Sequence, residues 1–175
     1  MGLYLGNYIL NYIYIMSTDF IINGNNFFSS NDGVIDKVDY NTPINQVSSL
    51  TVLGTVTGIS FSAFAKCSNL SSVDFSGATA LQTIGRQAFY QCTSLSSVNF
   101  SGVVALTSID EEAFRECSSL SSVIFPATIE TISRGAFSGC TSLNEINLSD
   151  TALTIIDDEV FQQCSSLSSI IFSAP

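Results

Sequence analysis

The residues with the most reactive side chains in this sequence are five cysteines that recur at nearly constant spacing. Cys67, Cys92, Cys117, Cys140 and Cys164 are separated by 25, 25, 23 and 24 residues. Thiols at one repeat position suggest a metal or disulfide array, but no two of these cysteines form the Cys-x-x-Cys pair of many zinc sites. Cysteine also packs in protein cores as a small apolar residue. We therefore expect buried, free thiols.

Two acidic runs offer a second candidate chemistry, the binding of calcium by carboxylate oxygens. They are Asp110-Glu111-Glu112 and Asp157-Asp158-Glu159. A different interpretation follows from one position that alternates in charge from repeat to repeat. Its members are Arg86, Glu111, Arg134 and Asp158. We expect an exposed ion-pair ladder there, with a small effect on stability.

Other features of the composition exclude whole classes of function. The sequence has no histidine and no glycine-rich phosphate loop, which removes Ser-His and Cys-His nucleophile pairs and the usual zinc ligand. Fifteen acidic and five basic residues give a net charge of −10, which disfavours nucleic acid and anionic membrane surfaces as partners. We predict that the protein is not an enzyme, needs no cofactor or metal ion, and has no integral membrane segment.

The cysteines belong to a repeat of 23 to 25 residues with five further apolar columns, a column being the residues at one position of successive repeats. The columns are Ile59, Ile84, Ile109, Ile132 and Ile156; Phe64, Phe89, Phe114, Phe137 and Phe161; Leu70, Leu95, Leu120, Leu143 and Leu167; Val73, Val98, Val123, Ile146 and Ile170; and Phe75, Phe100, Phe125, Leu148 and Phe172. One such unit is too small to cover its own apolar side, whereas stacked units share a continuous core. We therefore predict five stacked repeats over residues 59–175.

Within each repeat, two segments position these columns. Leu70-x-x-Val73-x-Phe75 alternates as a strand does, so stacked repeats place such strands side by side in a parallel sheet. The run Ile-x-x-x-Ala-Phe-x-x-Cys predicts a short helical or 3₁₀ turn on the opposite face. The predicted fold is an α/β repeat solenoid.

The run Cys-x-x-Leu-x-x-Val-x-Phe-x(5)-Leu-x-x-Ile-x-x-x-Ala-Phe-x-x-Cys resembles the BspA-like leucine-rich repeat family over residues 59–175. In that family a proline usually follows the strand and a glycine usually follows the isoleucine, and here only Pro126 and Gly85 match. Its members look like surface or secreted proteins used in adhesion and protein binding. The resemblance therefore implies a non-enzymatic interaction or adhesion module that is extracellular or at the cell surface.

Solenoids bind partners on an open face, and the strand alternation defines that face here. Its candidate residues are Ser72, Asp74, Ser97, Asn99, Ser122, Ile124, Glu145, Asn147, Ser169 and Ile171. The face is rich in serine and poor in the aromatic and arginine residues that dominate binding hot spots. A solvated face without a specific partner is the alternative.

The N-terminal third departs from the period and predicts a β-rich cap over residues 1–58. Ile35-x-x-Val38-x-Tyr40 matches the strand pattern, so we expect a divergent first repeat at 34–40 and an enlarged back loop at 41–58. Asn23-Gly24 between apolar runs is typical of a hairpin turn. The apolar segment 1–16 is either a strand or a signal peptide.

The C-terminal repeat stops just after its strand, which leaves its apolar side and strand edge without a cap. One interpretation is that the sequence is a piece of a longer array. The alternative is a structural subunit that assembles end to end, because head-to-tail contacts that do not close produce filaments. The candidate assembly residues are Tyr8, Tyr12, Tyr14, Leu167, Ile170 and Phe172.

Three Asn-x-Ser sequons, at Asn69, Asn99 and Asn147, are candidate N-glycosylation sites. Their number is what the asparagine, serine and threonine content gives by chance.

Overall fold

The computed structural model describes residues 20–22, 25–27, 33–35 and 46–173. Its strands form two sheets, named here the front sheet and the second sheet. The front sheet contains β1 (Phe20–Ile22), β2 (Asn25–Phe27), β4 (Ser49–Val52), β6 (Ser72–Asp74), β8 (Ser97–Asn99), β10 (Ser122–Ile124), β12 (Glu145–Asn147) and β14 (Ser169–Ile171). The second sheet contains β3 (Val34–Ile35), β5 (Gly58–Ile59), β7 (Thr83–Ile84), β9 (Ser108–Ile109), β11 (Thr131–Ile132) and β13 (Ile155–Ile156).

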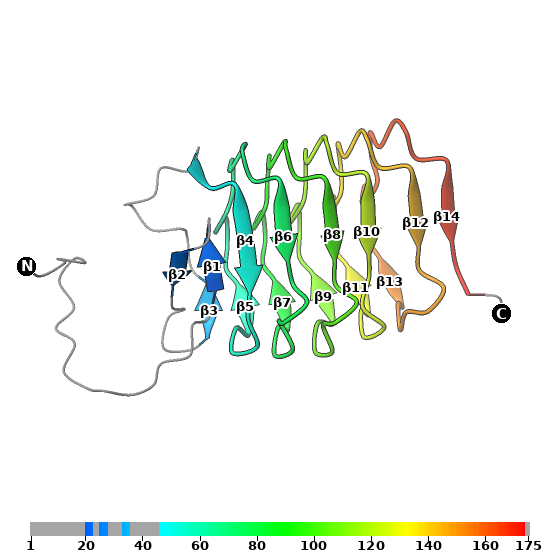
Figure 1. Cartoon of the computed structure of the whole chain (residues 1–175). Helices are drawn as coiled ribbons and strands as arrows, with labels where there is room; N and C mark the ends of the chain where they lie inside the picture. Colours follow the sequence, from blue (N-terminus) through cyan, green and yellow to red (C-terminus); the bar gives the residue numbers. More distant parts are fainter. Residues whose placement is uncertain (1–19, 23–24, 28–32, 36–45, 174–175) are drawn as a thin grey trace, which may run out of the picture.

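The chain winds as a solenoid in which each regular coil contributes one strand to each sheet (Figure 1). The front sheet has the order β14-β12-β10-β8-β6-β4-β1-β2, and the second sheet has the order β13-β11-β9-β7-β5-β3. Every pairing between successive coils is parallel. The solenoid predicted from the repeat is confirmed.

The front strands follow the two-residue period of a pleated strand. In β6, β8, β10 and β12 the central valine or isoleucine is buried and both flanking residues are exposed. Val73 pairs with Val98, and Val98 with Val123, so each column continues across the sheet. Because the columns superpose, one apolar core runs through all the coils.

The phenylalanine column lies at the centre of that core. The rings of Phe64, Phe89, Phe114 and Phe137 stack nearly parallel, with centroids 5.1–5.3 Å apart, and all four are fully buried. Aromatic rings prefer offset stacking at such separations. The prediction that this column is interior and continuous is confirmed.

The segment behind each core phenylalanine is not helical, and that part of the prediction is wrong. Residues 61–66 and their counterparts form consecutive turns, with left-handed backbone at two positions four residues apart. The left-handed residues in successive coils are Ser62 and Lys66, Gln87 and Gln91, Glu112 and Glu116, Gly135 and Gly139, and Glu159 and Gln163. A right-handed helix cannot contain such residues at regular intervals.

The hydrogen bonds of these back turns explain why no helix forms. The N–H of Phe64 donates to the carbonyl of Ala88 in the following coil (2.8 Å), whereas Ala63 and Ala65 donate to carbonyls three residues earlier in their own coil. A helix needs every N–H to bond within its own segment. Here alternate N–H groups are committed to the neighbouring coil, so stacking replaces helix formation.

The first coil also differs from the prediction at 34–40. Val34 and Ile35 form β3, which pairs in parallel with β5 of the second sheet. They therefore belong to the isoleucine column. Val38 and Tyr40, the rest of the predicted strand pattern, lie outside the described residues.

The front strand of this coil is β4, which lies within the predicted back loop 41–58. Leu50 of β4 pairs with Val73, and Val47, Leu50 and Val52 are buried. The sequence signal was Val47-x-x-Leu50-x-Val52. It was missed because all three apolar residues differ from Leu70, Val73 and Phe75, and because the connection to Val56 has three residues where the next two coils have five.

Beyond β4 the front sheet continues with antiparallel strands. Residue 22 of β1 pairs with Leu50 of β4, and residue 20 pairs with residue 27 of β2. The predicted Asn23-Gly24 turn and segment 1–16 lie outside the described residues. The N-terminal cap as a whole therefore stays a prediction.

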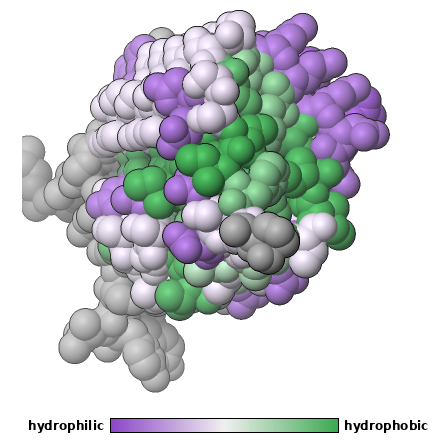
Figure 2. All heavy atoms as spheres, turned by 90° about the vertical axis from the view of Figure 1, so that its right-hand side faces the viewer, coloured by the Kyte–Doolittle hydropathy of each residue, from purple (hydrophilic) through white to green (hydrophobic). Residues whose placement is uncertain are grey.

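The C-terminal coil leaves apolar side chains exposed. Figure 2 views the molecule from this end and shows hydrophobic residues gathered across it. The exposed fractions are 49% for Ile155, 39% for Ile156, 38% for Ile170, 40% for Ile171 and 57% for Phe172. One coil earlier, Ile132, Ile146 and Leu148 are buried, so the exposure of their counterparts Ile156, Ile170 and Phe172 results from the absence of a covering coil in the described structure. Ile171 lies on the outer side of the front sheet, where its counterparts in the earlier coils are exposed as well.

Candidate partner-binding face

The ten residues of the predicted face form two adjacent columns on the outer side of the front sheet. The first column is Ser72, Ser97, Ser122, Glu145 and Ser169, and the second is Asp74, Asn99, Ile124, Asn147 and Ile171. All are exposed except Ser169, which is half-buried. The register pairs Ser97 with Ser122 and places Ile124 opposite Asn99 on one side and Asn147 on the other. The fold thus brings all ten residues onto one surface.

The face extends one strand further than the sequence suggested. Ser49 and Thr51 of β4 pair with Ser72 and Asp74 and continue the two columns. Both side chains are half-buried. They were missed because the front strand of this coil was placed at 34–40, and a correct alignment of Leu50 with Val73 would have found them.

The polar side chains of the second column have a structural role. Oδ1 of Asn99 accepts a hydrogen bond from the N–H of Ser101 (2.9 Å), and Asp74 and Asn147 accept equivalent bonds from residues two positions later (2.8 and 3.0 Å). This is the local turn that Asn and Asp side chains make with the backbone. These residues therefore fix the chain as it leaves the strand, whether or not they also bind a partner.

Ile124 and Ile171 are the two aliphatic residues of this column, and the coil of Ile124 explains why its position is not polar. The residue two positions later is Pro126, which has no N–H to donate, so a polar side chain at 124 would have no bond to accept. Ile124 is 52% exposed and lies between two amides. An exposed aliphatic side chain in the middle of a polar sheet has no such structural explanation.

A column of serines borders the face and links successive coils. The hydroxyls of Ser71, Ser96 and Ser121 donate to the carbonyls of Ser48, Ser71 and Ser96, each in the preceding coil (3.1–3.3 Å). Ser168 donates in the same way to Asn144 (2.9 Å). These hydroxyls join coils and are not free for a ligand.

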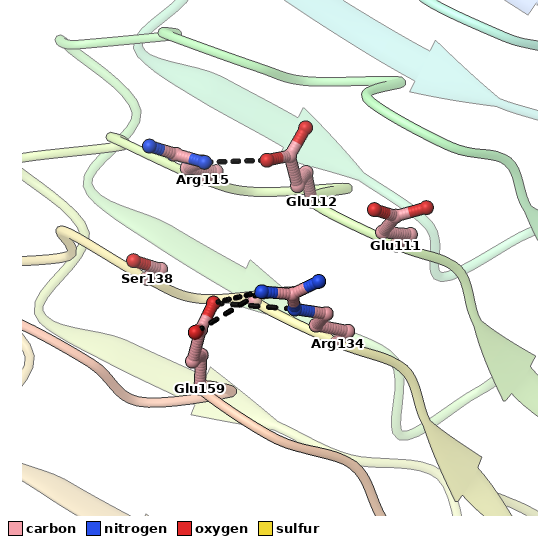
Figure 3. Close-up of a pocket in the computed structure, with 7 residues that line it drawn as sticks. Glu111, Glu112, Arg115, Arg134, Ser138 and Glu159 are labelled. Atoms are coloured by element: carbon pink, nitrogen blue, oxygen red, sulfur yellow. Dashed lines mark hydrogen bonds and ion pairs between the residues drawn. The ribbon is translucent and has the colours of Figure 1, made fainter.

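Among the described residues, the back turns carry most of the charged side chains, and their pairing only partly follows the predicted ladder. Arg86 contacts Glu111 (3.5 Å), as expected. Arg134 pairs with Glu159 through Nε and Nη2 (3.1–3.2 Å), not with Asp158 (Figure 3). The bonds to Glu159 raise the pKa of Arg134. The predicted column therefore holds for Arg86 and Glu111, whereas Arg134 is paired with the left-handed residue that follows the column in the next coil.

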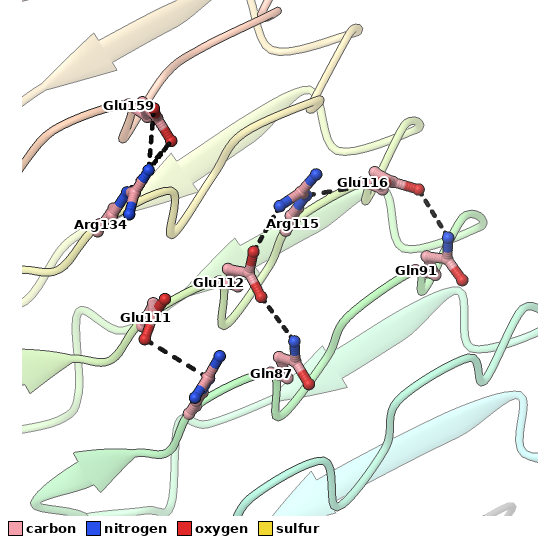
Figure 4. A network of polar contacts seen from close by, with 9 residues as sticks. Gln87, Gln91, Glu111, Glu112, Arg115, Glu116, Arg134 and Glu159 are labelled. Carbon is pink, nitrogen blue, oxygen red and sulfur yellow. Dashed lines mark hydrogen bonds and ion pairs between the residues drawn. The ribbon is translucent and has the colours of Figure 1, made fainter.

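A second group of charges crosses two coils beside this column (Figure 4). Gln87 donates to Glu112 (2.6 Å) and Gln91 to Glu116 (2.7 Å), while Arg115 lies between the two carboxylates and contacts both. The bond from Gln87, helped by Arg115, holds the pKa of Glu112 below its usual range. Asp110, which precedes this group, is partly buried, and that burial raises its pKa.

A hollow of about 140 Å³ lies over Gly135 and Ser138, where these small residues occupy the positions of the larger Glu112 and Arg115 of the preceding coil (Figure 3). Arg115 and Arg134 line it, but both guanidinium groups are paired with carboxylates. The hollow therefore offers no unpaired cation to an anionic ligand.

The five cysteines are free and buried, as predicted. Each thiol from Cys92 onward donates to a phenylalanine carbonyl of the preceding coil at 3.1–3.3 Å. Burial raises the pKa of Cys67 to about 12 and that of Cys140 still further. Within the described residues, no three His, Cys, Asp or Glu side chains gather closely enough to hold a metal ion.

The remaining predicted sites are placed as follows. Asn69, Asn99 and Asn147 of the sequons are all exposed, and their glycosylation stays a prediction. Leu167, Ile170 and Phe172 lie in the C-terminal coil, whereas Tyr8, Tyr12 and Tyr14 lie outside the described residues. The part of the chain that the structure describes holds no helix with the length and apolar character of a membrane span.

Comparison with known families decides the classification. A family model described as BspA type leucine rich repeat region (6 copies) matches residues 82–175, more than half of the chain. The chain belongs to the BspA-type leucine-rich repeat family. The resemblance seen in the sequence is thereby confirmed. No curated protein matches the sequence.

Solved bacterial leucine-rich repeat proteins share this fold. One from T. pallidum has a TM-score of 0.59 and 24% identity, over 74% of this chain and 65% of that one. One from Bacteroides ovatus has a TM-score of 0.52 and 24% identity, over 93% of this chain and 54% of that one. One from Eubacterium ventriosum has a TM-score of 0.69 and 21% identity, over 89% of this chain and 40% of that one. The BspA-type chain thus spans less than two thirds of the length of each of these proteins, and at these identities the likeness establishes the fold alone.

Proposed function

We propose that this protein is a non-enzymatic interaction module that binds another protein through the outer side of its front sheet, at the cell surface or outside the cell, in adhesion. Membership of the BspA-type family supports protein interaction as the general role. The outer side of a leucine-rich repeat sheet is the extended surface on which solenoids present binding residues.

The observation that carries the proposal is the exposed side chain of Ile124. The polar neighbours in its column are explained by the turns they fix. The side chain of Ile124 is 52% exposed, and exposure of apolar surface to water is unfavourable. Its flanking amides and the serines beside it can supply hydrogen bonds around an apolar contact. Such a centre with a polar rim is the usual anatomy of a transient protein interface.

The proposal is tested by binding of the whole chain to a panel of immobilised extracellular and cell-surface proteins, measured by biolayer interferometry. We expect at least one panel protein to bind with micromolar affinity and Ile124→Asn to weaken that binding about tenfold, the loss of one central apolar contact. Ile124→Asn repeats the residue found in the neighbouring coils, so the sheet is retained.

Val104→Asn is the matched control, because Val104 is 66% exposed but lies in a connection between the sheets. It should leave binding unchanged. Asp74 and Asn99 are poorer test positions, since changing them also removes a turn. Absence of any binding, or binding that Ile124→Asn does not affect, would contradict the proposal.

A second candidate function is that of a structural subunit that stacks end to end. The exposed apolar side chains of the C-terminal coil favour it, because an exposed apolar patch often marks a surface that contacts another protein. Sedimentation velocity over a hundredfold range of concentration tests it. A monomer at every concentration would exclude this candidate and leave the first one unaffected.

A further inference from the structure

The hollow of about 140 Å³ is a gap in the layer of long side chains that covers the back turns. At the level of the hollow, two positions of the repeat hold Gly135 and Ser138. The coils on either side carry longer side chains at the same positions, namely Glu112 and Arg115 before the gap and Glu159 and Gln162 after it. Gly135 has left-handed backbone, as Glu112 and Glu159 do, so the turn itself is regular. The hollow therefore results from side-chain size and is one coil wide.

Ser138 forms the floor of the hollow and is 5% exposed. Both of its backbone groups are hydrogen-bonded, since its N–H donates to the carbonyl of Gly135 (3.0 Å) and its carbonyl accepts from the N–H of Glu116 (2.7 Å). Its hydroxyl opens onto the hollow and has no hydrogen-bond partner within the described part of the chain. A buried hydroxyl without a partner is unfavourable, so this floor favours a bound molecule that supplies one.

Two arginines supply hydrogen-bond donors in the walls of the hollow (Figure 3). Arg134 donates to Glu159 through Nε and Nη2 (3.1–3.2 Å), and Arg115 donates to Glu112 through Nη1. Among the described residues, neither Nη1 of Arg134 nor Nη2 of Arg115 forms a hydrogen bond. Each arginine therefore keeps donors for a further ligand, while a carboxylate already balances its charge.

Three glutamates supply the acceptors of the walls. Glu112 and Glu159 are bound by the two arginines, and one oxygen of Glu111 lies 3.5 Å from Nε of Arg86. An ionised carboxylate has about four lone-pair sites, so each of these groups can accept further hydrogen bonds. Donors and acceptors thus lie together around the hollow, and every charge among them is paired.

These pairings argue against an ion as the ligand. Three carboxylates and two guanidinium groups leave a net charge of −1 around the hollow, which disfavours an anion. A cation would lie beside Arg115 and Arg134 and would compete with them for carboxylates that they already bind. A neutral molecule with several hydroxyl groups meets neither obstacle, because each hydroxyl both donates and accepts. Its hydrogen bonds to the charged groups would be charge-assisted and therefore strong.

From these features we infer that the hollow binds one neutral sugar unit, whose hydroxyl groups bond to Ser138 and to the ion pairs of the walls. A volume of about 140 Å³ is smaller than that of pockets for drug-sized molecules, which suits a single sugar ring. The unit is either a free monosaccharide or the end of a glycan, since both present the same hydroxyl groups. The site lies on the back turns and not on the front sheet, so it does not depend on the proposed function.

The test follows the amide signals of the isotope-labelled whole chain by NMR during titration with D-glucose, D-galactose, D-mannose and N-acetyl-D-glucosamine. Each sugar is added free and as its methyl glycoside, because the end of a glycan carries a substituent at its anomeric carbon. We expect at least one sugar to bind with a millimolar dissociation constant and to shift the amide signals of Gly135 and Gly139. Binding of the glycoside identifies a glycan end, and binding of the free sugar alone identifies a monosaccharide; either result agrees with the inference.

Ser138→Gln is the decisive variant, because it repeats Gln162 of the following coil and fills the gap. It should abolish the shifts without lowering the melting temperature. Ser138→Ala should weaken binding about three- to tenfold, the effect of one hydrogen bond, at unchanged stability, because the hydroxyl has no partner in the described protein. Ser119→Gln makes the matched change at an exposed serine outside the hollow and should leave binding unaltered.

The inference is overturned if none of the sugars binds, or if both folded variants at Ser138 bind sugar as well as the natural chain does. Circular dichroism shows whether each variant is folded, and Ser138→Ala decides the matter if Ser138→Gln is not. Inorganic phosphate and butylammonium are the charged probes. Tighter binding of either ion at Gly135 than of every sugar would also overturn the inference, since it would show that the hollow selects charge.

Discussion

At the scale of single residues, each buried cysteine combines a packing role with a hydrogen-bonding role. The thiol of Cys117 lies 3.1 Å from the carbonyl of Phe89, which also accepts the N–H of Cys92. Burial raises the pKa of Cys117, so the thiol keeps the proton that it donates. Alanine would fill less space and donate nothing, which explains why cysteine recurs at this position.

We predict that Cys117→Ala lowers the free energy of unfolding by about 2 kcal/mol and Cys117→Ser by about half as much, because serine keeps a donor. Urea unfolding of the two variants measures the difference. If the column only needs a small apolar side chain, the serine variant will be the less stable one, because a buried hydroxyl costs more than a methyl group.

Among the charged residues of the back turns, Glu112 makes the stability of the fold depend on pH. Its pKa in the folded chain lies below the ordinary value of 4.5, so the carboxylate stabilises the fold above that pH. The contribution is lost as the pH falls through the folded value. We predict that Glu112→Gln destabilises the protein at pH 7 and that the difference from wild type shrinks below about pH 4.5.

Urea unfolding from pH 7 to pH 3 measures this dependence. Glu130→Gln is the matched control, because its exposed side chain removes the same charge without the contacts to Gln87 and Arg115. A difference for Glu112→Gln that stays constant with pH would show that the carboxylate has no special environment.

At the scale of the element, the back turn is held open by left-handed residues that are mostly not glycine. Gly135 and Gly139 occupy two of these positions, but glutamine, glutamate, serine and lysine occupy the others. A residue with a Cβ in this region is strained relative to glycine. The neighbouring coil offsets that strain by accepting the N–H that the left-handed turn directs outward.

The adjacent residues Gln162 and Gln163 of the last coil allow the strain of left-handed backbone to be tested. Gln163 has a φ of 59°, whereas Gln162 has ordinary negative φ. We predict that Gln163→Gly raises the free energy of unfolding by up to about 1 kcal/mol and that Gln162→Gly lowers it by about 0.5–1 kcal/mol. Thermal melts of both variants show whether each change raises or lowers stability. A loss of stability in both variants would contradict left-handed backbone at residue 163.

At the scale of the whole molecule, each coil contacts only its neighbours, so the position of a residue along the stack decides its contribution. Phe114 is stacked between Phe89 and Phe137 at 5.1 and 5.3 Å and is fully buried. Phe161 belongs to the same column, but it has one ring neighbour, at 6.0 Å, and is only half-buried.

We predict that Phe114→Ala lowers the free energy of unfolding by about 3–5 kcal/mol and splits the unfolding transition, because it interrupts the stack between two groups of coils. Phe161→Ala should cost less than half as much and leave a single transition. Denaturant unfolding followed by fluorescence and circular dichroism measures both, and equal costs would show that the coils do not behave as a linear array.

The front strands show how far the sequence alone reached. Leu70-x-x-Val73-x-Phe75 and its repeats predicted the parallel strands, their buried columns and the ten residues of the outer face, because a constant period forces like side chains to superpose. The front strand at Leu50 was misplaced because three substitutions and a connection shorter than in the next two coils hid the same pattern. A repeat that departs from the common spacing in this way cannot be aligned from the period alone, so its strand is easily misplaced.

What the sequence by itself determined was the solenoid, its core and the free cysteines, since each follows from side-chain type and spacing. Only the tertiary structure decided the back turns, the pairing of Arg134 with Glu159, and the direction of the backbone hydrogen bonds between successive back turns. The physical reason is that these features depend on backbone hydrogen bonds between coils. Such bonds involve groups that every residue carries, so no pattern of side chains reveals their direction.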